Sequence, residues 1–283
     1  VHFHSAYLTG DSALEYFIRF IALRDYAGTP SRRSKSGSKM RASIDTSKSA
    51  LLLAFGAPFS CHGTKKARNE GKLRCVIIGI DGGTWDLVEP WAREGHLPHF
   101  ARILAEGATG PLRSTIHPLS APAWASFITG KNPGKHGVFD FVTYSQASHR
   151  MEVVNRRKIR SASLWRTLSD AGKRVCSVNV PLTYPPEEVN GNLVAGWLAP
   201  GKDSNFTFPA SLKEELLDVA GNYIFEPGVE HYGDTVEAHE QFLSDIAQSM
   251  DVRNKVLHHL WTKEDWDIFM NVFIEADRVQ YKF

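Results

Sequence analysis

The run Cys75–Ile80 most constrains what this chain can fold into. It is apolar and rich in β-branched side chains, which is typical of a strand buried on both faces of a parallel sheet. Asp81 follows it, and Gly82-Gly83 then breaks the strand. Helical periodicity comes next over 97–106 and stops at a glycine. Strand, glycine turn and helix together form the first unit of an α/β fold.

The same alternation continues through the rest of the chain. Spacing predicts further helices and strands, the helices over 123–128, 163–171, 212–219 and 236–260 and the strands over 174–180 and 266–273. We therefore predict an α/β fold, a three-layer α/β/α sandwich with a mainly parallel central sheet. The less regular stretch 185–235 is expected to form a cap over the site.

The charge distribution divides the chain at residue 72. Residues 1–72 carry a net charge of +7, whereas residues 73–283 carry −5. This predicts a basic leader ahead of a folded domain. Within the leader, 13–26 has the spacing of an amphipathic helix, and 28–39 is a Ser/Gly-rich basic run typical of a linker. We expect no nucleic-acid polymer as a partner, because the basic charge lies outside the folded part.

The segment 50–61 is short and apolar, and basic residues precede it. This is the outline of a signal peptide that starts at Met40, although Asp45 is out of place there and no small-x-small cleavage site follows. We expect a cytoplasmic protein, with a secreted or periplasmic one as the alternative if 40–61 is a signal peptide. No run of eighteen apolar residues occurs, so we expect no transmembrane segment.

Candidate site residues follow from the expected strand ends. Ligands bind beyond the carboxyl ends of the strands in such a sheet, which directs attention to Asp81, to the loop after Asn179 and to 275–277. Each aspartate also has a structural interpretation. Asp81 fits a turn or a helix cap, and Asp277 fits a helix N-cap paired with Arg278.

The segment 117–141 contains Ser120 between two prolines, where a short helix is expected to begin. Ser120 is therefore a natural N-cap. The same geometry suits a phosphate, because a helix N-terminus presents unpaired amides and a positive dipole end. A serine hydroxyl is a weak nucleophile at neutral pH unless a base or a metal activates it. Both interpretations of Ser120, cap and nucleophile, stay open at this point.

Together these segments resemble the type I phosphodiesterase/nucleotide pyrophosphatase family of the alkaline phosphatase superfamily, in its prokaryotic form. The resemblance covers about 73–283, and the matching segments are, in order, 76–86, 120–141, 179–186 and 273–280. It implies an alkaline-phosphatase-like α/β/α fold and a metal-dependent phosphoric ester hydrolase. It also implies a small phosphoester or nucleotide-like substrate and two divalent metal ions, usually Zn²⁺.

The resemblance also implies roles for three residues. Asp81 matches a ligand of the first metal. Ser120 matches the nucleophile, which coordinates that metal and becomes transiently phosphorylated. Asp277 matches a ligand of the second metal.

Departures from the family pattern gather at the C-terminal end. The family has a metal-binding histidine four residues after the aspartate, where this chain has Tyr281, and its later ligands would lie beyond Phe283. Neutral tyrosine is a poor zinc ligand beside imidazole. We therefore expect 73–283 to be the N-terminal part of a truncated catalytic domain with an incomplete metal site and an unfinished sheet that favours dimerisation or aggregation. An inactive remnant, or a phosphate-binding module without turnover, is the alternative.

Overall fold

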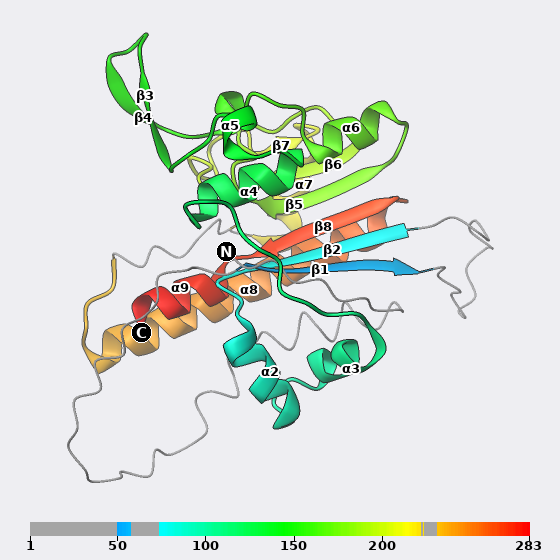
Figure 1. Cartoon of the computed structure of the whole chain (residues 1–283), viewed down its shortest axis with the longest axis vertical. Coiled ribbons are helices and arrows are strands. Elements are labelled where there is room, and N and C mark those ends of the chain that lie inside the picture. Colours follow the sequence, from blue (N-terminus) through cyan, green and yellow to red (C-terminus); the bar gives the residue numbers. More distant parts are fainter. Residues whose placement is uncertain (1–49, 58–73, 222, 224–230) are drawn as a thin grey trace.

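The computed structural model describes residues 50–57, 74–221, 223 and 231–283 (Figure 1). The expected helix over 13–26 and the linker over 28–39 lie outside these residues. The described elements, in chain order, are β1 (Ala50–Ala57), β2 (Arg74–Asp81), α2 (Trp85–Arg93), α3 (Pro98–Glu106), α4 (Ser120–Thr129), α5 (Pro133–His136), β3 (Val142–Ser145), β4 (Arg150–Val153), the 3₁₀ helix η2 (Arg156–Lys158), α6 (Leu164–Asp170), β5 (Val175–Val180), β6 (Gly191–Ala195), β7 (Thr207–Phe208), α7 (Leu212–Ala220), α8 (Val236–Lys263), β8 (Ile268–Phe273) and α9 (Glu275–Lys282).

The core of the molecule is one mixed sheet in the order β1-β2-β8-β5-β6-β7. The four inner strands β2, β8, β5 and β6 run parallel, and β1 and β7 are antiparallel at the two edges. The parallel strands are almost entirely buried, as expected for a sheet covered on both faces. The mainly parallel sheet predicted from the sequence is therefore confirmed.

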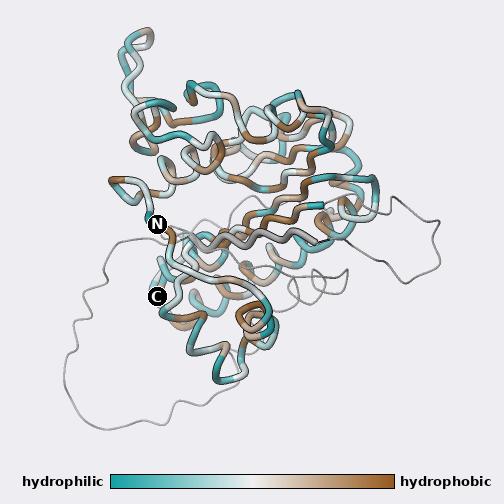
Figure 2. The backbone as a smooth tube through the Cα atoms, turned by 45° about the vertical axis from the view of Figure 1, so that its right-hand side comes forward, coloured by the Kyte–Doolittle hydropathy of each residue, from teal (hydrophilic) through white to brown (hydrophobic). Residues whose placement is uncertain are grey.

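Helices cover both faces of this sheet and make three layers (Figure 1). On one face α4 and α6 pack through Trp124, Ile128 and Trp165 onto the strands. The other face is covered by α2, α3, α7 and α8, whose apolar side chains meet alternate residues of the same strands. Brown, apolar stretches of the tube in Figure 2 accordingly run along the strands of the sheet. This is the α/β/α sandwich that the alternating pattern predicts.

Residues 50–57 differ from their expected place in a leader. They form β1, which pairs with the whole of β2 from Ala50 opposite Asp81 to Ala57 opposite Arg74. A short apolar run suits a strand as well as the apolar part of a signal peptide, so the sequence did not indicate this pairing with β2. No helix among the described residues is both long and apolar enough to cross a membrane.

Two further regions also differ from expectation. The described part of the stretch 185–235, where a cap is predicted, includes β6, β7 and α7, which belong to the sandwich. Among the described strands, β8 comes last in the sequence but lies in the middle of the sheet, between β2 and β5. The sequence also did not indicate the hairpin β3–β4, which stands apart from the main sheet in Figure 1.

Candidate functional site

Three parallel neighbours, β2, β8 and β5, end at the same edge of the sheet. Asp81 is the last residue of β2, Asp277 lies in the first turn of α9 directly after β8, and Asn179 lies near the end of β5. All three side chains are buried. The edge where the sequence predicted a site therefore carries the polar groups expected there.

Gly82 brings the two aspartate-bearing segments into contact. Its φ of 77° is in the left-handed region, and a Cβ on it would lie 2.6 Å from the Cα atom of Asp277. The Gln280 side chain donates a hydrogen bond to the Gly82 carbonyl oxygen at 2.6 Å. Only a glycine leaves room for this approach, so the turn after β2 is packed directly against the start of α9.

Ser120 is the first residue of α4, and it is buried. The N-cap position belongs to Leu119, whose φ of −97° and ψ of 147° are extended, and no side chain caps this helix end. The interpretation of Ser120 as an N-cap is therefore wrong. Its hydroxyl instead belongs to the first turn of a ten-residue helix, at the end where the dipole is positive.

Trp124 connects α4 to Asp81. Its indole Nε1–H donates to Asp81 Oδ2 at 3.4 Å, and the ring is fully buried. Ser120 and Trp124 are four residues apart and so lie on the same side of the helix. Sequence reasoning missed Trp124, although its spacing from Ser120 was a signal that could have indicated it.

The Asp277 carboxylate has a cation beside it. Arg278 Nη2 lies 3.1 Å from Asp277 Oδ2, and the Arg278 guanidinium also stacks over the Trp197 ring at 4.9 Å. The pairing of Asp277 with Arg278 is thus confirmed, but the N-cap role for Asp277 is wrong because Ile274 holds that position.

A second charged pair joins α8 to the start of α9, and the sequence did not indicate it. Arg253 Nη1 of α8 donates to Glu275 Oε1 at 2.5 Å, and the two side chains are 1% and 2% exposed. Ser249, one helical turn before Arg253, donates to the same oxygen at 3.4 Å. Burial raises the pKa of the nearby Tyr223 phenol, while the Arg253 guanidinium opposes that rise and the Glu275 carboxylate adds to it.

Two of the described histidines, His136 and His259, are engaged in contacts of their own. His136 is buried in α5, where Nδ1 accepts from the Val138 N–H at 3.1 Å. The ring proton therefore sits on Nε2, which donates to Ser126 Oγ at 2.9 Å. Burial also lowers the pKa of His136, which keeps the ring neutral. His259 of α8 pairs with Glu215 of α7 at 2.5 Å.

The donor set fits a divalent cation only in part. Two aspartates and a serine hydroxyl offer hard oxygen donors, which divalent cations accept. In the described ranges, however, no three or more histidine, cysteine, aspartate or glutamate side chains come together as a metal-binding group. Each zinc ion needs three or four protein ligands, so the described residues do not complete a two-zinc site.

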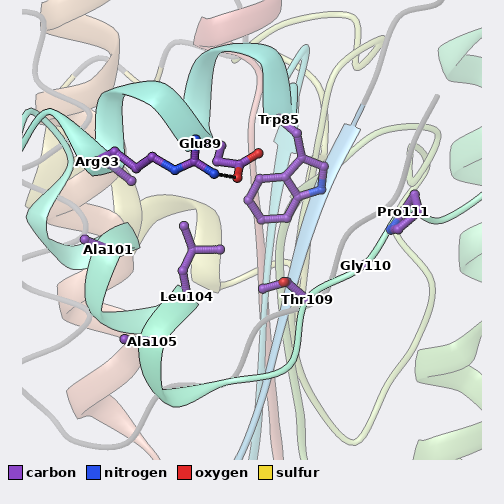
Figure 3. A pocket seen from close by; sticks show the side chains of 10 residues that line it. Trp85, Glu89, Arg93, Ala101, Leu104, Ala105, Thr109, Gly110 and Pro111 are labelled. Atoms are coloured by element: carbon purple, nitrogen blue, oxygen red, sulfur yellow. Dashed lines mark hydrogen bonds and ion pairs between the residues drawn. The ribbon is translucent and has the colours of Figure 1, made fainter.

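A pocket of the described structure lies elsewhere. It has a volume of about 690 Å³ and is formed between α2 and α3 by residues such as Trp85, Leu104 and Thr109 (Figure 3). An ion pair between Glu89 and Arg93 crosses its wall. None of the candidate residues lines it, so we locate the site by the strand ends and not by this pocket.

Comparison with known proteins gives one match. The family model for type I phosphodiesterase / nucleotide pyrophosphatase matches residues 75–283. No curated protein and no solved structure matches the chain. The matched range contains the inner strands of the sheet and every candidate residue of the site. The chain therefore belongs to the type I phosphodiesterase/nucleotide pyrophosphatase family, a group of hydrolases within the alkaline phosphatase superfamily.

Proposed function

We propose that this protein hydrolyses phosphoric esters with Ser120 as the nucleophile. Asp81 and Asp277, with the Ser120 hydroxyl, are the groups we propose as ligands of two divalent metal ions, Zn²⁺ by preference. The observation that carries the proposal is the meeting of three segments at one sheet edge. Gly82 packs against Asp277, and Trp124 joins the helix of Ser120 to Asp81.

The chemistry that we assign to the chain itself begins at Ser120. Its Oγ attacks phosphorus, the bond from phosphorus to the leaving oxygen breaks, and the departing alcohol takes up a proton. Water then attacks the phosphoserine, releasing phosphate or its monoester and restoring the hydroxyl. The amide groups at the start of α4 favour the negative phosphoryl oxygens throughout. Bound divalent ions would lower the pKa of the nucleophile and neutralise the developing charge.

A small phosphoester or nucleotide-like molecule is the substrate that we propose. The alternative function, a phosphate-binding module without turnover, is favoured by the incomplete set of metal ligands among the described residues. The two functions differ in whether a phosphoserine forms. An experiment on Ser120 itself therefore distinguishes them.

The first prediction concerns Ser120→Ala, assayed with bis(p-nitrophenyl) phosphate in the presence of Zn²⁺. Turnover is expected to fall to background because no other group replaces the nucleophile. Acid-quenched wild-type protein should yield a peptide that carries a p-nitrophenyl phosphoryl group on Ser120. Wild-type turnover by Ser120→Ala would refute the mechanism, and phosphate binding without any turnover in the wild type would establish the binding module.

Ser163→Ala is the matched control. Ser163 caps α6, where its hydroxyl accepts from the Arg166 N–H at 3.1 Å. Its removal should cost about 1 kcal/mol of stability and leave turnover unchanged.

A further inference from the structure

The Trp124 side chain extends from α4, the helix that also carries Ser120, onto β2, the strand that ends at Asp81. The indole has one hydrogen-bond donor and no acceptor. That donor, Nε1–H, is directed at Asp81 Oδ2. The rest of the ring is in the apolar core between α4 and the sheet. The ring therefore packs α4 against the sheet and donates a hydrogen bond to the Asp81 carboxylate.

The strand below is shaped to receive this ring. Gly79 and Asp81 are two residues apart on β2 and so point to the same face. A Cβ on Gly79 would lie 2.8 Å from Trp124 Cη2 and 3.1 Å from Val272 Cγ2. Real Cβ atoms do not approach other atoms at 2.8 Å, so only glycine lets the indole rest on the strand.

The ring is also restrained from the helix side. Phe127 meets it edge-on, with ring centroids 5.8 Å apart and an interplanar angle of 82°. Ser120 lies one helical turn before Trp124. The contact of the ring with Gly79 therefore restrains α4, the helix that carries Ser120, against β2.

We propose that Trp124 is a positioning residue that holds the Asp81 carboxylate in one orientation and fixes the distance between Asp81 and Ser120. It acts through these two residues and touches no substrate. The functional consequence rests on the proposed function, in which Asp81 binds a divalent ion. Hydrogen bonds to metal-binding carboxylates typically contribute 10- to 100-fold in metal affinity.

Trp165 offers a matched control in the same apolar cluster. It is as buried as Trp124, and its Nε1–H also donates to a carboxylate, Glu187 Oε2, at 2.9 Å. Among the described residues, the hydrogen bonds of Glu187 come from Trp165 and Arg156, neither of which is a candidate site residue. Replacement of either tryptophan by phenylalanine removes the same N–H group and a similar ring volume.

The test compares Trp124→Phe with Trp165→Phe by thermal unfolding and by calorimetric titration with Zn²⁺. Both variants should lose a similar amount of thermal stability. Only Trp124→Phe should weaken Zn²⁺ binding, by about tenfold or more. Gly79→Ala, which displaces the ring but keeps its N–H, should weaken Zn²⁺ binding as well. Wild-type Zn²⁺ affinity in Trp124→Phe and Gly79→Ala would overturn the proposal while leaving the proposed function intact.

A metal-free measurement separates the two proposals. In the wild type the indole N–H signals of Trp124 and Trp165 are assigned by NMR from the two phenylalanine variants. Asp81→Asn should move the Trp124 signal and leave that of Trp165 in place. If the wild type binds no Zn²⁺, the proposed metal site fails, and this shift alone decides whether Trp124 holds Asp81. An unmoved Trp124 signal rejects the positioning role.

Discussion

Single residues determine how closely the segments of the site approach one another, and at Gly82 the turn after β2 lies directly against the backbone of Asp277. We predict that Gly82→Ala destabilises the protein and weakens Zn²⁺ binding, because its φ is positive and its Cβ would collide with the Asp277 backbone. The measurements are chemical denaturation and Zn²⁺ titration. Gly130→Ala is the control, since Gly130 also has a positive φ but open space around it, and it should cost only about 1–2 kcal/mol. Equal effects of the two substitutions would contradict this prediction.

The sequence indicated the carboxylates of the site but not the residues that hold them. Asp81 and Asp277 follow recognisable strands, and the carboxyl ends of parallel strands meet in space, so their type and position were predictable. Trp124 was not predicted, because a tryptophan in an apolar helix is ordinarily a core residue. Arg253 pairs with Glu275 across 22 residues, and no local pattern reports a contact of that range.

At the scale of elements, α8 and α9 are joined by the buried pair of Arg253 and Glu275. We predict that Arg253→Met alone lowers the free energy of unfolding by about 3–5 kcal/mol, because it leaves a buried carboxylate without its cation. The double substitution Arg253→Met with Glu275→Leu should restore most of that loss, since apolar residues often replace a buried ion pair without cost. Denaturant unfolding of Arg253→Met, of Glu275→Leu and of the double variant completes the double-mutant cycle. Strictly additive losses would show that the two side chains do not interact.

For the helices and strands that the sequence predicted in the sandwich, the boundaries followed the hydrophobic pattern closely, whereas α2, β6 and β7 were not predicted. The segment 212–219 was expected as a helix, and α7 spans Leu212–Ala220. The pattern failed for β3–β4, whose apolar residues Val142, Tyr144, Met151 and Val153 are all exposed. Short strands with no buried face give little periodic signal.

At the scale of the whole molecule, we expect the edge strand β1 to limit self-association of the protein. We predict that removal of residues 1–57 causes self-association, because β2 then presents unpaired N–H and C=O groups that β1 otherwise satisfies. Sedimentation velocity over a range of concentrations measures this. Removal of residues 1–49 keeps β1 and is the control, which should sediment as the full chain does. Equal association of both shortened chains would show that β1 does not protect the edge.

Strand order is the part of the whole fold that the sequence did not provide. The alternation of strands and helices predicts layers and direction, but several orders of the same strands satisfy it. The position of β8 between β2 and β5 depends on packing from both sides at once, with Cys75 and Val175 each paired to Ile268.

The central place of β8 has a consequence for synthesis on the ribosome. β2 and β5 are both synthesised before β8, and they do not pair with each other; each pairs with β8, which lies between them. Before β8 is made, each nascent half exposes an apolar strand edge, and closure requires contacts between residues far apart in sequence, which form slowly. We therefore expect the nascent chain to need protection of these strand edges until β8 has been synthesised.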